Sequence, residues 1–349
     1  MELALARFRL LFKHPFGTAH GLRDGTDCVL VRLGDDGHEG YGEATLPPYL
    51  KEDQDSVIAE IMAFARSGLP FDRVPSEFEL RLPSSLSSPA RAAISTAYYD
   101  LIFKKLNKSI SSYFGSRGRP SVAPRTLVTL GHSELDEISL KLKELPASSV
   151  LKVKLGSGND LNTLDRLMDL DHRDLVLDVN QAWSTISEAL NVIDRIGPRR
   201  IAGVEQPFAK HRWDLHAELT SMGEVCVIGD ESIQDPEDLR RAPGTFGGIN
   251  LKLMKCGGVD VAADMLDEAR RLGLMVMLGS MSESSLGCGA MASLAAQADL
   301  LDLDGPWLIK NDPYQGLGIE QGDLIIPEGP GFGIELRSEA DLDWATIGA

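Results

Sequence analysis

The sequence has few cysteines and no long hydrophobic run. Its 349 residues include only Cys28, Cys226, Cys256 and Cys288, and no two of them form a CxxC pair, so neither a zinc site nor a redox pair is expected. We interpret all four as small buried hydrophobes. No apolar segment approaches the roughly 20 residues that span a bilayer, and the N-terminus lacks the features of a signal peptide. The sequence therefore predicts a cytoplasmic protein without a membrane partner.

Positive charge is also scarce. The chain has 35 Lys and Arg against 52 Asp and Glu, a formal net charge of -17. An acidic surface repels phosphate backbones, so nucleic acid is not an expected partner. The net charge says little about a small substrate, because one local cation reverses the field inside a cleft. Hydrophobic residues (43%) and charged residues (25%) are as frequent as in globular proteins.

The first third of the chain is predicted to be an α+β domain of about 115 residues, because strands come first and helices follow. A polar, glycine-containing segment from Pro15 to Asp27 is expected to be a loop between the first two strands. Gly40 and Gly42 leave little room for side chains on the third strand. The predicted strands are residues 2–12, 28–33 and 38–44, and the predicted helices are 53–66 and 88–105.

From about residue 125, short apolar strands alternate with amphipathic helices. Eight such strands indicate a closed α/β barrel, with a doubly wound open sheet as the alternative. No GxGxxG or GxxxxGK[ST] motif supports a nucleotide-binding version of that alternative. A turn-rich tail with a short strand at 324–326 is expected to pack back on the N-terminal domain. The barrel strands are predicted at Thr126–Leu130, Val150–Leu155, Leu175–Asn180, Ala202–Gln206, Cys226–Asp230, Ile249–Leu253, Leu274–Gly279 and Leu300–Asp304.

Charged residues stand at the carboxyl ends of five consecutive barrel strands, 22 to 27 residues apart. Each step is one strand-plus-helix unit, so these side chains are predicted to meet at the rim where barrel enzymes keep their active sites. Asp178 or Asp230 taken alone is explained as well by a helix N-cap, but charges in register at the ends of five strands are not. The charges are Lys152 and Lys154, then Asp178, Glu205, Asp230 and Lys252.

The three carboxylates are hard oxygen ligands without a neighbouring His or Cys, a set that selects Mg²⁺, or Mn²⁺ in its place. Asn180 is expected to orient one of these ligands. Lysines crowded by another cation and a metal have a lowered pKa, so a pair facing each other supplies a base and an acid on either side of a carbon. The metal then holds the enediolate formed between the two steps. Lysines that only form ion pairs with the carboxylates are the structural alternative.

The pattern KxK, DxN, E, D and a lysine five residues before Gly257-Gly258 resembles the muconate-lactonizing subgroup of the enolase superfamily. The resemblance covers nearly the whole chain. It implies a modified (β/α)7β barrel at residues 119–318, and an α+β capping domain at residues 1–118 completed by residues 319–349. It also implies that Lys154 and Lys252 are the acid/base pair, that Lys152 helps to hold the substrate carboxylate, and that Asp178, Glu205 and Asp230 bind the metal.

Within the subgroup, the segments INLKLMKCGG, LGSMSES and DLDGP are most similar to the dipeptide epimerases of the L-Ala-D/L-Glu type. The resemblance implies that Asp302 and Asp304 bind the substrate α-ammonium, although an Asp-Gly turn with an N-cap explains the pair equally well. It implies that Arg23 binds an acidic side chain of the substrate. An arginine that is simply exposed to solvent explains the residue equally well. Tyr49, Ser280 and Met281 are further pocket candidates; Ser280 departs from the cysteine common in this group, which bears on side-chain fit.

The predicted function is thus a Mg²⁺-dependent dipeptide epimerase, with a dipeptide as its small-molecule partner and a homo-oligomer as its assembly. Other members of the superfamily remain alternatives: an N-acylamino acid racemase, an o-succinylbenzoate synthase or a muconate cycloisomerase. A metal-binding barrel that senses a ligand without chemistry has no need for paired lysines. A Schiff-base aldolase leaves the three carboxylates unexplained.

Overall fold

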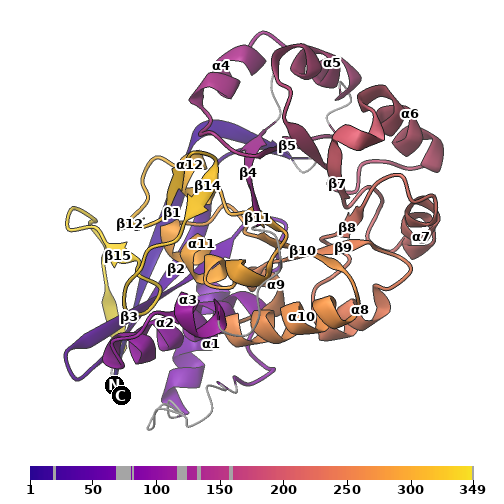
Figure 1. Ribbon diagram of the computed structural model, residues 1–349. Helices are drawn as coiled ribbons and strands as arrows, with labels where there is room; N and C mark the ends of the chain where they lie inside the picture. Colours follow the sequence, from indigo (N-terminus) through magenta and orange to yellow (C-terminus); the bar gives the residue numbers. More distant parts are fainter. Residues whose placement is uncertain are drawn as a thin grey trace.

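The computed structural model describes residues 1–18, 21–67, 80, 82–115, 124–131, 135–156 and 160–347. An antiparallel sheet lies beside a closed barrel of eight parallel strands (Figure 1). Helices α4, α5, α6, α7, α8 and α10 lie outside the ring of strands, and the two ends of the chain lie next to each other by the sheet (Figure 1). None of the helices in the described part is long and apolar enough to cross a membrane.

The antiparallel sheet has the order β16-β1-β2-β3, with β1 at Glu2–Thr18, β2 at Gly21–Asp35, β3 at His38–Leu46 and β16 at Ala345–Ile347. The predicted loop from Pro15 to Asp27 is wrong outside residues 19–20, which are not described. Its backbone pairs as a long hairpin in which Phe16 is opposite Arg23, after an irregularity that follows Leu11. Ladder hydrogen bonds thus overrode the turn-forming composition of this segment.

Helix α2 (Ser88–Lys105) packs on β3 more closely than side chains allow. A Cβ atom added at Gly40 would lie 2.2 Å from the carbonyl oxygen of Ala97, and one at Gly42 would lie 1.9 Å from that of Ala93. The glycines therefore let the helix backbone contact the strand backbone directly. Both α2 and α1 (Gln54–Arg66) match the predicted helices closely, and a third helix, α3, spans Ile110–Gly115.

The barrel closes in the order β10-β11-β4-β5-β6-β7-β8-β9, and every strand pair is parallel. The barrel prediction is confirmed, and the open doubly wound sheet is wrong. Strand bounds differ from prediction mainly at the carboxyl ends, where the chain leaves the ladder early. The strands are β4 (Arg125–Leu130), β5 (Val150–Lys154), β6 (Asp174–Asp178), β7 (Ile201–Glu205), β8 (Val227–Gly229), β9 (Gly248–Leu251), β10 (Met275–Gly279) and β11 (Leu300–Asp302).

Seven strand-to-helix units precede β11, as the (β/α)7β layout requires. The apolar stripe of α10 is buried as predicted, and Gly273 follows the end of the helix with a left-handed φ of 73°. The helices are α4 (Ile138–Glu144), α5 (Asp160–Leu170), α6 (Ile186–Ile196), α7 (Trp213–Ser221), α8 (Pro236–Arg241), α9 (Leu253–Cys256), α10 (Val259–Arg271) and α11 (Ser285–Ala292).

The chain beyond the barrel returns to the N-terminal sheet, as expected. Strand β16 pairs with β1, and the buried Asp100 of α2 accepts hydrogen bonds from the backbone of Tyr41 (3.0 Å) and of Phe332 in the tail (3.2 Å). The boundary near residue 118 lies outside the described residues, so the exact domain limits stay predictions. The tail elements are α12 (Gly305–Leu308), β12 (Tyr314–Gln315), β13 (Gly318–Glu320), β14 (Asp323–Ile325) and β15 (Glu335–Leu336).

All four cysteines are free thiols. Cys28, Cys256 and Cys288 are buried as predicted, whereas Cys226 is half-buried. Burial raises the pKa of the Cys256 thiol to about 11, so that this group behaves as a small apolar side chain at neutral pH.

Because α2 packs so closely on β3, adding one methyl group at this contact is expected to destabilise the protein. Gly42→Ala places its Cβ against a helix carbonyl and is expected to lower the free energy of unfolding by about 3 kcal/mol or more. Gly34→Ala is the matched control in the same sheet, because the nearest heavy atom to its Cβ is 3.8 Å away. Urea unfolding of both variants checks this. Equal stabilities would contradict the backbone contact.

Candidate active site

The charged residues singled out from the sequence come together at one end of the barrel. Ten of the twelve predicted site residues line a single cavity of about 610 Å³. The other two, Asp178 and Glu205, are fully buried. The cavity-lining residues among the predictions are Arg23, Tyr49, Lys152, Lys154, Asp230, Lys252, Ser280, Met281, Asp302 and Asp304.

The parallel register sets the level of these side chains. Lys154 is opposite Asp178, and Asp178 is opposite Glu205, each as the last residue of its strand. Directly after these strands the chain turns through left-handed backbone at Asn180 (φ 46°) and Gln206 (φ 39°). Such conformations are unfavourable for residues other than glycine and concentrate at functional sites.

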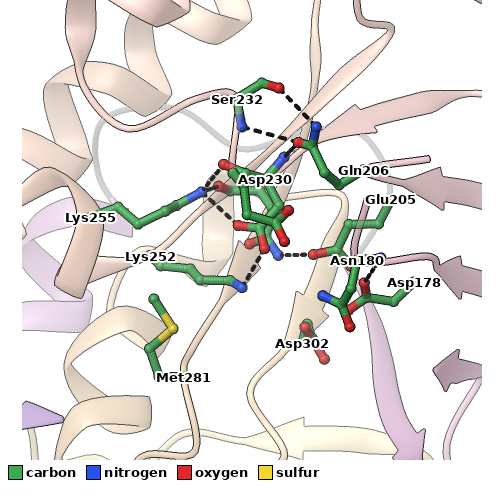
Figure 2. Close-up of polar contacts among 12 residues, drawn as sticks. Asp178, Asn180, Glu205, Gln206, Asp230, Ser232, Lys252, Lys255, Met281 and Asp302 are labelled. Atoms are coloured by element: carbon green, nitrogen blue, oxygen red, sulfur yellow. Dashed lines mark hydrogen bonds and ion pairs between the residues drawn. The ribbon is translucent and has the colours of Figure 1, made fainter. Parts of the chain in front are cut away.

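Gln206 stabilises this turn. Its side-chain oxygen accepts hydrogen bonds from the backbone N–H groups of Asp230 and Ser232, both at 3.0 Å. The amide is fully buried and also donates to the Ser232 hydroxyl at 2.8 Å (Figure 2). Gln206 thereby fixes the backbone on which Asp230 stands, a role that the sequence did not suggest.

The carboxylates of Asp178 and Glu205 share the ammonium of Lys152. Its Nζ lies 2.9 Å from Asp178 Oδ2 and 2.7 Å from Glu205 Oε2. Burial raises the pKa of Glu205 to about 7, and the neighbouring Asp178 carboxylate adds to the rise. For Asp178, burial is outweighed by Lys152 and Lys154, which hold the pKa of its carboxyl well below the usual range. Lys154 Nζ donates to Asp178 Oδ2 at 2.5 Å.

Asp230 is held by two lysines (Figure 2). Lys252 donates to Oδ2 at 2.8 Å, and Lys255 donates to Oδ1 at 2.7 Å. Lys255 also donates to the backbone oxygens of Asp230 (2.7 Å) and Asn250 (2.8 Å), so all three of its protons have acceptors. Lys255 was not among the predicted site residues, and its position about one helical turn after Lys252 is the signal in the sequence that points to it.

The predicted lowering of the lysine pKa concerns a site that holds a metal, and it stays a prediction. Burial alone would lower the pKa of Lys252, but the carboxylates of Asp230 and Glu205 raise it above its usual value. The carboxylates of Asp178 and Asp302 likewise outweigh burial and raise the pKa of Lys152 above its usual value. In the structure the lysine ammonium groups neutralise the carboxylates. The pKa of Lys255 is lowered by burial, yet its three donated hydrogen bonds leave no lone pair for a base.

The donor set fits a hard divalent cation. Three carboxylates come from neighbouring strands, and Asn250 Nδ2 holds Glu205 Oε1 at 2.8 Å. The other oxygen, Oε2, is buried and receives no hydrogen bond in the described structure, although it contacts Lys152. Lysine ammonium groups lie between the carboxylates. Among the described residues, no three acidic, His or Cys side chains lie close enough together to bind one metal ion in this conformation. Crowded carboxylates of this kind are what Mg²⁺ neutralises.

Asp302 and Asp304 differ in their partners. Asp302 Oδ2 lies 2.6 Å from Lys152 Nζ, whereas Asp304 Oδ2 accepts a hydrogen bond from the backbone N–H of Thr129 at 2.5 Å. Burial raises the pKa of Asp304 to about 6, with the Asp302 charge adding to the rise. Asp302 is thus the one of the pair that forms an ion pair within the cavity.

Arg23 forms the opposite wall with aromatic residues. Its guanidinium carbon lies 5.6 Å from the Phe12 ring centre and 5.8 Å from that of Tyr49. Its Nε is buried without a hydrogen-bond partner in the described structure. Tyr49 donates to Met281 Sδ at 3.2 Å, so Arg23, Tyr49 and Met281 form one contiguous wall. Ser280 lines the cavity nearby.

Two buried glutamates that the sequence analysis did not single out support this wall from behind. Glu283 Oε1 accepts a hydrogen bond from the Met281 N–H at 2.7 Å, while Oε2 has no partner among the described residues. Burial raises the pKa of Glu283 to about 8, and the charge of Glu43 adds to the rise. Glu43, on β3, accepts hydrogen bonds from the N–H and hydroxyl of Ser284, which caps α11. The N-terminal sheet is thereby bonded to the barrel rim.

Comparison with known proteins identifies relatives along nearly the whole chain. Residues 147–340 match the family model described as enolase C-terminal domain-like. The L-Ala-D/L-Glu epimerase of Bacteroides thetaiotaomicron is 33% identical over 342 residues, covering 96% of this chain and 88% of the relative. An L-Ala-D/L-amino acid epimerase of a Maribacter species is 34% identical, covering 97% and 100%.

Solved structures agree with these relatives. The dipeptide epimerase of Enterococcus faecalis, in complex with Mg and L-Leu-L-Tyr, superimposes with a TM-score of 0.84 at 27% identity, covering 95% of this chain and 98% of the other. The substrate-liganded L-Ala-D/L-Glu epimerase of Bacillus subtilis gives a TM-score of 0.83 at 25% identity, covering 95% and 97%.

Glu283 predicts a pH dependence of stability. Its usual pKa is 4.5 and its pKa in the folded protein is about 8, so between these pH values the folded state holds a proton that the unfolded state has lost. The contribution of Glu283 to the free energy of unfolding is therefore expected to fall by up to about 1.4 kcal/mol per pH unit as the pH rises. This contribution levels off above pH 8. Glu283→Gln removes this contribution. The exposed Glu320→Gln is the control, and a shared slope for the two variants would disprove the assignment.

Proposed function

The chain belongs to the enolase superfamily, and on that premise we propose that it is a Mg²⁺-dependent dipeptide epimerase that moves the α-proton of the C-terminal residue of its substrate. The observation that carries the proposal is the placement of two lysines. Lys154 ends β5 and Lys252 follows β9, and these strands are four positions apart in a ring of eight. Two such groups face a bound α-carbon from opposite sides.

Inversion of configuration at a carbon requires an acid and a base on opposite faces of that carbon. One lysine, as a neutral amine, removes the α-proton from one face, and the other, as an ammonium, delivers a proton to the opposite face. The reverse reaction exchanges the two roles. In the structure Lys252 is an ammonium held by Asp230 (2.8 Å), which is its proton-donating form. Lys255, with its protons all donated, anchors Asp230 and takes no part in proton transfer.

The ends of the substrate are assigned by charge. Lys152 holds the α-carboxylate next to the metal ligands, and Asp302 with Asp304 binds the free α-ammonium. Arg23 suits an acidic side chain, because a guanidinium binds a carboxylate in a bidentate manner. The names of the relatives support L-Ala-L-Glu and its D-Glu epimer as substrates.

Asp178, Glu205 and Asp230 would hold the divalent cation. When bound, it supplies positive charge beside the substrate carboxylate and makes the α-proton more acidic. With such a cation beside Asp230, Lys252 would have less negative charge around it and its pKa would be lower, which favours the neutral amine that proton abstraction needs. Mn²⁺ as a substitute, the cytoplasmic location and the homo-oligomeric state stay predictions.

The assignment of the two lysines is tested by isotope exchange. In D₂O the native protein is expected to place deuterium at the α-carbon of both epimers of L-Ala-Glu, as measured by NMR. Lys154→Ala and Lys252→Ala should each lower epimerisation by about 10³-fold. Each variant should still exchange one epimer, and the two variants should retain opposite epimers, because one lysine remains on one face.

Lys310→Ala, which removes an exposed lysine that does not line the cavity, is the matched control and should retain native activity. Full epimerase activity in either cavity variant would refute the acid/base pair. Exchange of the same epimer by both variants would place the two lysines on one face.

Metal dependence gives a second test. Treatment with a chelator is expected to abolish exchange, and added Mg²⁺ to restore it. Asp178→Asn and Asn250→Leu should both weaken the stabilisation by Mg²⁺ in thermal unfolding, the first by removing a ligand and the second by releasing Glu205. Undiminished exchange after metal removal would argue against the proposal.

A further inference from the structure

Glu231 is a carboxylate of the cavity wall to which the proposed reaction gives no role. It comes two residues after the end of β8 and lines the cavity. One carboxylate oxygen, Oε1, accepts a hydrogen bond from Gln181 Nε2 at 3.2 Å. The other, Oε2, is buried and receives no hydrogen bond in the described structure, although the residue as a whole is partly exposed. A buried acceptor without a donor is unfavourable, so Oε2 points to a group that binds there.

The Glu231 carboxylate is held in place by two glutamines. Gln206 Oε1 accepts hydrogen bonds from the backbone N–H groups of both residues that flank Glu231, each at 3.0 Å. Gln181, which holds Oε1 of Glu231, is itself anchored, because its side-chain oxygen accepts a hydrogen bond from the backbone N–H of Lys210 at 2.9 Å. Backbone and side chain of Glu231 are therefore both fixed, and Oε2 is presented in a defined position.

Glu231 also belongs electrostatically to the proposed metal ligands. Burial raises the pKa of Glu231 to about 7, and the negative charges of Asp230 and Asp178 add to the rise. Carboxylates crowded in this way repel each other in the metal-free protein. A divalent cation beside Asp178 and Asp230 would relieve the repulsion on Glu231 as well.

We propose that Glu231 is a fourth carboxylate of the cation site and that its Oε2 accepts a hydrogen bond from a water molecule of the hydrated ion. The inference rests on the proposed function and adds a residue to its metal site. Mg²⁺ is octahedral and keeps several waters when proteins bind it. The three proposed ligands leave positions for such waters, and each water needs acceptors for its protons. A fixed, negatively charged acceptor raises the affinity for the ion, because a charge-assisted hydrogen bond is stronger than a neutral one.

Glu231→Gln tests this role with little change of shape. Its side-chain oxygen can still accept from Gln181, but an NH₂ group takes the place of Oε2 and offers no acceptor. The dissociation constant for Mg²⁺ is measured by calorimetry on the metal-free protein without substrate, and the variant is expected to bind at least about tenfold more weakly. Glu52→Gln is the matched control, because Glu52 also lines the cavity and loses the same charge. It is expected to change the affinity by less than about twofold.

Thermal unfolding separates this role from a merely structural one. Glu231→Gln removes a crowded charge, so the metal-free variant is expected to unfold at the native temperature or higher, while its stabilisation by Mg²⁺ falls. If Glu231 only supported the loop through Gln181, the metal-free variant would be less stable. Gln181→Leu would then weaken Mg²⁺ binding at least as much as Glu231→Gln. Either result would overturn the inference.

An unchanged Mg²⁺ affinity of Glu231→Gln would overturn the role of Glu231 and leave the proposed epimerase intact. A native protein that binds no Mg²⁺ would instead remove the metal site on which the proposed function depends. The two failures are therefore distinguishable.

Discussion

Compensation of buried negative charge at the carboxyl end of the barrel is the constraint on which the site depends. Asp178, Glu205 and Asp230 stand within a few ångströms of a tightly packed interior, where isolated carboxylates are very unfavourable. Lys152, Lys252 and Lys255 supply the counter-charge directly. A cation, a substrate terminus or a proton that enters the site adds charge to this balance.

The lysines do not contribute equally to that balance. Lys255 is bound by two backbone carbonyls besides the Asp230 side chain. Lys152 and Lys252 pair with carboxylate side chains instead. The charge of Lys255 is thus tied to the backbone, whereas the charges of the other two are tied to side chains. This division explains why a lysine with a lowered pKa is nonetheless unsuited to be the base.

The N-terminal sheet takes part in the site through contacts that leave little freedom. Backbone-to-backbone packing of α2 on the glycines of β3 sets the position of the sheet, and Glu43 bonds it to the cap of α11. The strand hairpin then carries Arg23 to the cavity, where Tyr49 and Met281 complete the wall. Arg23 and Tyr49 in this wall therefore come from the N-terminal domain, whereas the lysines and carboxylates of the site belong to the barrel.

The sequence by itself determined the barrel, the end of it that carries the charges, and the identity of the charged residues. A strand-plus-helix repeat puts one residue per unit at a common rim, and that periodicity is local. It did not determine the long β1–β2 hairpin, because ladder pairing between distant residues outweighs turn-forming composition. Nor did it reveal Lys255, Gln206 or Glu283, whose roles depend on partners from other elements. Only the tertiary structure decided which ammonium pairs with which carboxylate, because that choice depends on distances of a few ångströms between separate strands.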